Sequence, residues 1–517
     1  MFDASILAPE LWLSILQQLP TTELVSFAAT NRHFALLGRP LLFRHFEFAP
    51  YGLDLASELE EQLYQVSEEA FPAELERTRF WCSEEIAPLV RTCSIRAWDP
   101  AERPRSRKCA GDPFALLDIF FELIARFAGL RRLVLDRIDL SAEQRVSAIA
   151  KGLLLLEDLE VRIPRDVPGI PALPDLQPAT RLTHFDLSAA DDDALINWTP
   201  FLDPQHLRDL ALDCDLHSWV SIPAFPNVTA LCATITSGPE PQHFDRFFAS
   251  FPNVERLLLI SDEDVLASDI ADTARGCRPM LDSDSLTSLA VAHEFLGAFL
   301  LPPPARLTQL RINSGPGAEE LVGILAGRVL PSVVLLQLDL TIPDPALLFD
   351  VMRSFPALRE AHIEMTDCED YDAQTRASTA LPFLQALASP SSDSDVVFWP
   401  TTLENVYLSW GDVDRIVTGH RLAGPRHDFP SFNSVAKHRP AEVIFARLRE
   451  ALMARMPVLD SLWIDGHSFL FVWRRGTSVT GRWDVCTDDA DLADETAAIV
   501  DEFWATRRRV VPTHTLV

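Results

Sequence analysis

Paired cysteines, positive charge and long apolar runs are all scarce in this sequence. Its 8 cysteines stand singly, without the close pairing of zinc sites or the density of disulfide-stapled folds, so we expect reduced and mostly buried thiols. The sequence has 45 Lys and Arg but 75 Asp and Glu, and the formal net charge of -30 would repel a phosphate backbone. This balance argues against nucleic acid and anionic membranes as partners.

Signals for membrane insertion and secretion are lacking as well. The apolar stretch 289–301 is interrupted by His293 and Glu294, and no run approaches the length that spans a bilayer. The chain opens with an acidic residue, Asp3, and not with basic residues before an apolar core. We therefore expect a protein of the cytoplasm, the nucleus or both.

At 517 residues, the chain exceeds what one compact core usually organises, which predicts several domains or a repeating solenoid.

What the chain does contain is a repeated Leu-x-x-Leu-x-Leu pattern, in which other small or apolar residues can replace leucine. Copies begin at positions 90, 130, 156, 182, 207, 228, 254, 286, 307, 333, 358, 403 and 459. From 130 to 358 the starts lie 21 to 32 residues apart, and most of these spacings are typical of leucine-rich repeats. Each copy predicts a short strand, and the copies must stack because one alone cannot bury its apolar edge.

Segments between the copies have the three-to-four residue spacing of amphipathic helices. The clearest are 114–127, 143–155, 318–330, 346–355 and 441–456. This alternation predicts the α/β class, as a leucine-rich-repeat solenoid of horseshoe shape. The solenoid should be irregular, because the turn position that carries asparagine in regular repeats holds other residues. In four copies these are Ile138, Pro164, Ala190 and Gly315. A doubly wound α/β sheet is the alternative, although it would not need the fixed leucine spacing.

The first fifty residues do not follow the repeat and predict three short helices. The first begins at Pro9, a favourable residue in a first helical turn, and stops at Pro20. The second begins near Thr21, and the third covers about 32–44. Their apolar surface exceeds what so small a module can bury within itself, so we expect another surface to cover it.

Five short motifs follow one another in this stretch. They are Pro-Glu-Leu at 9–11, Ile-Leu at 15–16, Leu-Pro at 19–20, Asn-Arg-x-Phe at 31–34 and Pro-Leu-Leu-Phe at 40–43. In this order they resemble the F-box of fungal F-box proteins, although Ala8 departs from the common Leu-Pro-Pro-Glu form. The resemblance implies docking onto the Skp-type linker, and so onto the cullin complex, of a cullin-RING ubiquitin ligase. The matching contact positions are Pro9, Leu11, Ile15, Leu16, Leu19 and Pro20.

These expectations divide the chain into four parts. Residues 1–50 form the F-box module, 51–88 a helical linker, 89–486 the repeat arc, and 487–517 a capping helix with a tail. The cap is expected over 492–508, because a solenoid must hide its last apolar edge. A leucine-rich N-terminal helix as a cap for the first repeat is the alternative interpretation, and it is compatible with docking.

Side chains that alternate with the leucines lie on the opposite face of the predicted strands. On that face the early copies are acidic, the middle copies apolar, and the late copies a mixture of acids and aromatics, which would suit a basic peptide with an apolar stretch. We expect Glu160 and Asp186 to be exposed, so that reversing both charges would slow association with little effect on stability. Alternatively, the acids only keep the arc soluble. The candidate target-binding residues are Asp158, Glu160, Asp186, Asp209, Leu258, Ile260, His362, Tyr407 and Trp463.

Motifs that approach those of enzymes are each incomplete. The Gly-His-Ser-Phe-Leu run at 466–470 lacks the second glycine of a nucleophile elbow, and His293-Glu294 lacks the second histidine of a zinc site. We therefore expect no catalytic activity and no cofactor. The predicted function is that of a substrate-recognition adaptor in an SCF-type ubiquitin ligase, whose repeats bind an unknown target protein. A repeat scaffold that acts outside any ligase is the alternative.

Overall fold

A computed structural model divides the chain into two compact units, which are Met1–Val254 with Asp262–Val265, and Glu255–Ser261 with Leu266–Val517. The structure describes residues 8–54, 62–98, 107–108, 112–163, 178–189, 197–213, 222–235, 241–261, 285–300, 304–313, 318–341, 345–366, 400–409, 450, 458–465, 469–474 and 480–483. The capping helix expected at 492–508 and most of the helix expected at 441–456 lie outside the described residues.

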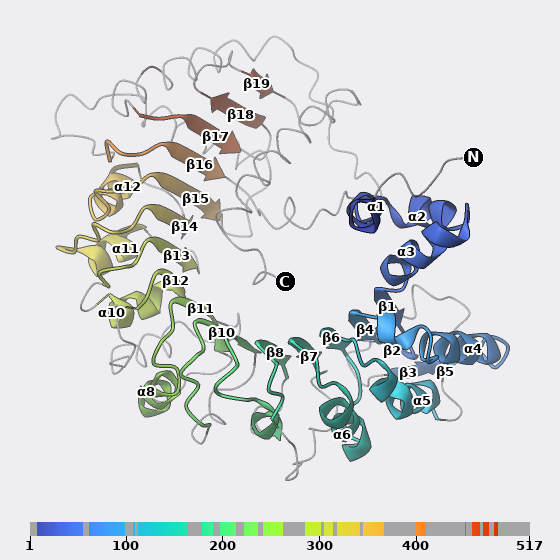
Figure 1. Ribbon diagram of the computed structural model, residues 1–517. Coiled ribbons are helices and arrows are strands. Elements are labelled where there is room, and N and C mark those ends of the chain that lie inside the picture. Colours follow the sequence, from blue (N-terminus) through green and yellow to red (C-terminus); the bar gives the residue numbers. More distant parts are fainter. Residues whose placement is uncertain are drawn as a thin grey trace. The chain divides into compact units, whose positions relative to one another are not determined.

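Seven parallel strands form the main sheet of the first unit (Figure 1). In spatial order they are β1 (His45–Phe48), β4 (Thr92–Arg96), β6 (Arg132–Asp136), β7 (Asp158–Arg162), β8 (His184–Ser188), β9 (Asp209–Asp213) and β10 (Ala230–Ile235). The strands from β4 to β10 each carry one copy of the repeat, so the predicted strands are confirmed. Strand β1 precedes the first predicted copy and falls inside the range expected for the N-terminal module.

Helices of the first unit accompany these strands. They are α5 (Ala115–Leu123), continued by the 3-10 turn η4 (Ile124–Arg126), α6 (Glu143–Gly152) and α8 (Pro241–Ala249), with a further 3-10 turn, η5 (Thr199–Phe201). Helices α5 and α6 lie on the same side of the strands (Figure 1). Leu117 and Phe120 on α5 and Ile149 on α6 are fully buried, as expected for the inner face of an amphipathic helix. The helices predicted at 114–127 and 143–155 are confirmed.

The N-terminal part of the first unit contains more strand than the sequence predicted. After α1 (Pro9–Leu16), α2 (Thr21–Ala28) and α3 (Arg32–Leu42), the chain forms β1 and then an antiparallel sheet. This sheet consists of β2 (Tyr51–Asp54), β3 (Gln62–Gln65) and β5 (Arg107–Lys108), and the 51–88 segment also holds α4 (Phe71–Trp81) and the turn η2 (Ala87–Leu89). The helical linker is therefore only partly helical. Strand β2 passes so close to the Trp98 ring that a Cβ atom on Gly52 would lie 2.6 Å from it.

The second unit repeats the same plan. Its parallel strands are β11 (Arg256–Ser261), β12 (Ser288–Ala292), β13 (Gln309–Asn313), β14 (Leu335–Thr341), β15 (Glu360–Thr366), β16 (Asn405–Ser409) and β17 (Ser461–Asp465), followed by the antiparallel β18 (Phe469–Arg474) and β19 (Thr480–Trp483). Its described helical elements are η7 (His293–Phe295), α10 (Leu296–Phe299), α11 (Ala318–Leu325) and α12 (Pro345–Met352). Helices α10 to α12 lie on one side of β12 to β15 (Figure 1). All predicted strands of this unit are present, and the helices predicted at 318–330 and 346–355 are confirmed.

The core of each unit is built from leucine positions that are stacked in register. Leu133, Leu159, Phe185 and Leu210 are aligned across β6 to β9, and each is almost completely buried. In the second unit Leu310, Leu336, Ala361 and Val406 are aligned in the same way. Burial of each large side chain stabilises the stack by about 1.5 to 3 kcal/mol. Each copy gains this stabilisation from its neighbours, which is the property that defines a solenoid-like repeat.

Paired backbone hydrogen bonds at the start of many strands link one copy of the repeat to the copy before it. The Arg131 carbonyl accepts the amides of Glu157 at 2.8 Å and Asp158 at 2.9 Å, and the Glu157 carbonyl accepts those of Thr183 and His184. The same paired arrangement recurs from the Arg44 carbonyl in the first unit to the Glu404 carbonyl in the second. Because main-chain groups make these bonds, they do not require one particular side chain. Repeats as irregular as these can therefore still stack.

Candidate functional site

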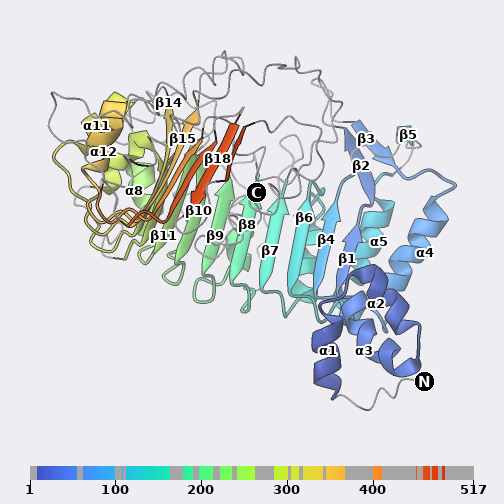
Figure 2. The same cartoon turned by 90° about the horizontal axis from the view of Figure 1, so that it is seen from above.

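The three N-terminal helices are fixed by local signals in the sequence. Pro9 begins α1, where its missing amide hydrogen is not needed, and Pro20 directly precedes α2. Asn31 caps α3, because its side-chain oxygen accepts the Phe34 amide at 2.9 Å. Figure 2 shows these helices near the beginning of β1. The helices expected in the first fifty residues are therefore present.

Aromatic rings and leucines form the centre of this module. The Trp12 ring lies 4.8 Å from the Phe34 ring, which lies 4.4 Å from that of Phe27. Leu16 and Leu24 complete the centre, and Leu16 is only 1% exposed. Leu16 was predicted as a contact position, and the structure places its side chain in the core of the module.

Large apolar side chains also point outward from the same helices. Leu11 and Ile15, one turn apart on α1, are 54% and 43% exposed. Pro20 is exposed and Leu19 half-buried, whereas the side chain of Pro9 is outside the description. Val25 on α2 and Leu36 on α3 are 53% and 63% exposed, and neither is among the contact positions that the F-box resemblance implies. The signal for them was available, since each is apolar at a helical position facing away from the buried residues of its own helix. We define Leu11, Ile15, Val25 and Leu36 as the apolar set of the module.

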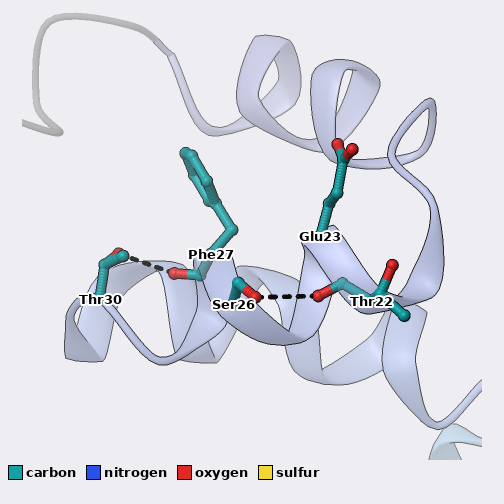
Figure 3. Close-up of a pocket in the computed structure, with 5 residues that line it drawn as sticks. All are labelled: Thr22, Glu23, Ser26, Phe27 and Thr30. Atoms are coloured by element: carbon teal, nitrogen blue, oxygen red, sulfur yellow. Dashed lines mark hydrogen bonds between the residues drawn. The ribbon is translucent and has the colours of Figure 1, made fainter.

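A shallow hollow of about 380 Å³ runs along one face of α2 (Figure 3). The surface that faces it is mainly apolar, although four of the five lining residues are of polar type. They are Thr22, Glu23, Ser26, Phe27 and Thr30. The Ser26 hydroxyl donates to the Thr22 carbonyl at 3.0 Å, and the Thr30 hydroxyl donates to the Phe27 carbonyl at 2.7 Å. These hydroxyl protons are used within the helix. Among the residues that line the hollow, Glu23 is the one carboxylate, and the lining has no nucleophile paired with a base.

The module is attached firmly to the first strand of the repeats. Arg39 on α3 forms a 2.7 Å ion pair with Glu85, and the Phe43 ring lies 5.4 Å from the Trp81 ring. Trp81 also stacks on Phe46 of β1, with ring centroids 4.8 Å apart. Because Phe43 ends the module and Phe46 begins the sheet, Trp81 connects the two. This contact limits how far the module can turn relative to its strand.

Replacing Trp81 by Ala should loosen this connection. We expect the free energy of unfolding to fall by about 2 kcal/mol, because a half-buried indole loses its contacts with two rings. Hydrogen exchange followed by mass spectrometry should show faster exchange in α3 and β1, with Trp81→Phe as the control that keeps a ring. Faster exchange confined to α4 would show that the indole does not connect the module to the sheet.

The acidic candidates of the first unit lie together, but two of them are less exposed than predicted. Asp158 and Asp209 flank His184 in register, and Glu160 is aligned with Asp186 on the neighbouring strand. The Glu160 side chain is only 12% exposed, and Asp186 is half-buried. The prediction that both residues are exposed is therefore wrong. Reversing their charges would disturb stability as well as association.

Arginines explain why Glu160 is held close to the sheet. Arg132 contacts the Glu160 carboxylate at 3.2 Å from one side, and Arg162 contacts it at 2.8 Å from the other. Arg132 also pairs with Asp158 at 3.3 Å. Sequence reasoning missed both arginines, although each occupies a position that alternates with the repeat leucines. Much of the acidic character of β7 is thus already balanced within the protein.

The candidates of the second unit form a separate group. Ile260 is exposed and Leu258 half-buried, which leaves both available for contact. His362 and Tyr407 are aligned in register with ring centroids 5.7 Å apart, but they are 4% and 6% exposed. Their predicted role at a binding surface is therefore not supported in this conformation, since burial removes them from contact. Trp463 lies on β17, and its side chain is outside the description.

Within the described part of the chain, no group of three or more His, Cys, Asp or Glu side chains is arranged to hold a metal ion. His293, from the incomplete zinc motif, is largely buried in the turn η7, and its ring lies 3.2 Å from the Glu294 carboxylate. Among the same residues, no helix is both long enough and apolar enough to cross a bilayer.

Comparison with known proteins adds little to this geometry. No protein-family model matches the chain, and no curated protein matches it. A solved structure that is similar comes from Bacteroides fragilis, with 13% identity over 59% of this chain and 67% of that chain. Its TM-score of 0.28 is too low to carry an argument about fold or function.

Proposed function

We propose that this protein is the substrate-recognition adaptor of an SCF-type cullin-RING ubiquitin ligase. The N-terminal module docks onto the Skp-type linker, and the repeats hold a target protein. Ubiquitin transfer belongs to other subunits, so this chain needs no catalytic group of its own. The single observation that carries the proposal is the outward-facing apolar set Leu11, Ile15, Val25 and Leu36 on a small helical module.

Exposed apolar side chains of this size favour burial against a partner. A module that already has a centre of Trp12, Leu16 and Phe34 does not need further leucines for its own folding. Burial of one such side chain at an interface contributes about 1.5 to 3 kcal/mol. Taken with the F-box resemblance of this stretch, these side chains favour a helical linker protein as the partner.

The contact between the module and β1 also supports an adaptor. An adaptor must hold its target in a defined place relative to the ligase, which requires a stiff connection between docking and recognition parts. The Trp81 ring contacts provide such a connection within the first unit, and the exposed Arg39–Glu85 ion pair adds a smaller contribution. The target is proposed to bind the sheet face formed by the side chains that alternate with the buried leucines of the repeats.

Reconstitution with purified components tests this function. The full chain should co-elute in gel filtration with a fungal Skp-type linker, and a cullin should join that complex. A linker carrying charged substitutions in its F-box-binding helices serves as the control and should not co-elute. If the intact linker fails to co-elute, the ligase role is wrong, and a repeat scaffold that works outside any ligase becomes the better proposal.

A further inference from the structure

One row of side chains crosses β7 to β10 on the sheet face that alternates with the buried leucines. In register order the row is Glu160, Asp186, Ala211 and Cys232. Glu160 is balanced by Arg132 and Arg162, whereas Asp186 has no hydrogen bond or ion pair with any residue in the part of the chain that the structure describes. The fold thus half-buries a carboxylate without a directly paired cation.

Charged groups reach Asp186 from each neighbouring strand. Strand β7 contributes Asp158, Glu160 and Arg162, and β8 itself contributes His184. Strands β9 and β10 contribute Asp209, Asp213 and the Cys232 thiol. Burial, followed by the negative charge of Glu160, raises the pKa of Asp186 from 3.8 to about 6. Arg162 and His184 act in the opposite direction but do not offset this rise.

His184 responds to pH in the same sense. The Asp209 carboxylate, 4.0 Å from the His184 ring, raises the pKa of the imidazole above its usual 6.5. Cys232 does not add a charge, because burial and the nearby carboxylates raise the pKa of its thiol to about 12. His184 and Asp186 on β8 therefore both hold protons more tightly in the folded protein than in an unfolded chain.

We propose that this part of the sheet is a proton-linked stability switch: Asp186 takes up a proton in mildly acidic solution and thereby tightens β7 to β9, and loses it near neutral pH. The neutral carboxyl no longer repels Glu160 across the 158–162 and 184–188 strand pair. At neutral pH the same strands carry an uncompensated charge and open more readily. The inference concerns the repeats alone and does not depend on whether the N-terminal module docks onto a linker.

Proton linkage determines whether folding stability rises or falls with pH. A carboxyl with a higher pKa in the folded state makes folding weaker as pH rises from its unfolded pKa of 3.8 to its folded pKa of about 6. His184 acts in the same direction, since the stability from its raised pKa is present below 6.5 and is lost as pH rises through the folded value. Across this window the folding equilibrium constant changes by up to about 100-fold through Asp186.

Thermal unfolding of the full chain tests the switch. Asp186→Asn should melt at a higher temperature than the wild type at pH 7.5, and this difference should shrink to nothing or reverse at pH 4.5. Glu122→Gln removes the same charge from the exposed face of α5 and serves as the control, with a small difference that does not follow this pH course. A difference between Asp186→Asn and wild type that stays constant with pH would overturn the proposal.

Hydrogen exchange of the wild type provides a second test that does not require the variant to fold. After correction for intrinsic exchange rates, peptides covering 184–188 and 209–213 should be better protected at pH 5.5 than at pH 7.5. Peptides covering β14 and β15 of the second unit serve as the reference and should change less. Equal changes in both sets would mean that the pH response is general and not located at Asp186, which also overturns the proposal.

Discussion

Replacing Leu11 and Ile15 together by aspartate is expected to abolish capture of a Skp-type linker while leaving the repeats folded. Both side chains are about half exposed in the free chain, so introducing a carboxylate costs little before binding. In the complex each change removes about 1.5 to 3 kcal/mol of apolar burial and places an unpaired charge in the interface. Together they should weaken binding by at least about 4 kcal/mol, roughly a thousandfold in Kd. Gel filtration and calorimetry with the purified linker measure this loss.

Two other exposed apolar residues provide a matched control for this variant. Leu154 and Val329 are 76% and 55% exposed, and both lie in the repeats and outside the N-terminal module. Aspartate at these two positions makes the same chemical change and should leave linker capture intact. A thermal melt of both double variants should resemble that of the wild type. If the Leu11 and Ile15 variant still co-elutes with the linker, the docking surface lies elsewhere and the F-box assignment fails.

The sequence predicted the repeat strands well because their signal is physical and local. A strand that is buried on one face needs apolar residues at alternate positions. In each copy the first apolar residue stands three positions before this pair, in the turn that leads into the strand. Every predicted copy coincides with a strand. Strand β1 was missed although Phe43, Phe46 and Phe48 have the spacing of the repeat, because Phe43 was assigned to the N-terminal helical module. The stacked ring of Phe127, 5.9 Å from that of Phe46, helps to hold it in place. That contact joins positions far apart in the chain, which no local pattern reveals.

The sequence predicted on which side of the sheet each candidate site residue lies, but not how far its side chain is exposed. Alternation places Glu160 and Leu258 on the side opposite the buried leucines, and this placement is consistent with the structure. How far each side chain is covered depends on the register between strands. The alignment of β6 with β7 brings Arg132 to Glu160, which Arg162 reaches from two residues along the same strand. The alignment of β7 with β8 places Asp186 beside Glu160 without a directly paired cation. A register depends on loop lengths and packing over the whole unit, and so it does not follow from spacing alone.

A large stability effect is expected at Arg145, a buried cation on α6. Its guanidinium is almost fully buried and contacts Asp118 of α5 at 2.8 Å and the Asp139 carboxylate at 3.2 Å. It also donates to the Asp139 carbonyl at 2.8 Å and lies 5.0 Å from the centre of the Phe114 ring. One side chain thus joins two helices and the turn after β6.

Asp139 extends this network to the second sheet. Its amide donates to the Tyr51 hydroxyl at 2.8 Å, and that hydroxyl donates to the Arg137 carbonyl at 2.9 Å. Arg137 has a positive φ of 57°, an uncommon backbone conformation for a residue other than glycine. The turn between β6 and α6 therefore depends on Asp139 being held in place by both Tyr51 and Arg145.

Replacing Arg145 by methionine should lower the free energy of unfolding by about 3 to 5 kcal/mol, because it leaves Asp139 partly buried without its cation. Arg145→Lys should lose less, since it keeps the charge but cannot reproduce the planar fork that reaches Asp118 and Asp139 together. Arg131→Met is the matched control, because its 3.1 Å ion pair with Glu157 lies on the surface and should contribute less than about 1 kcal/mol. Urea unfolding and hydrogen exchange of α5 and α6 measure these changes. Equal losses for Arg145→Met and Arg131→Met would mean that the buried pair only offsets its own desolvation, and that apolar packing alone holds α5 and α6 against the strands.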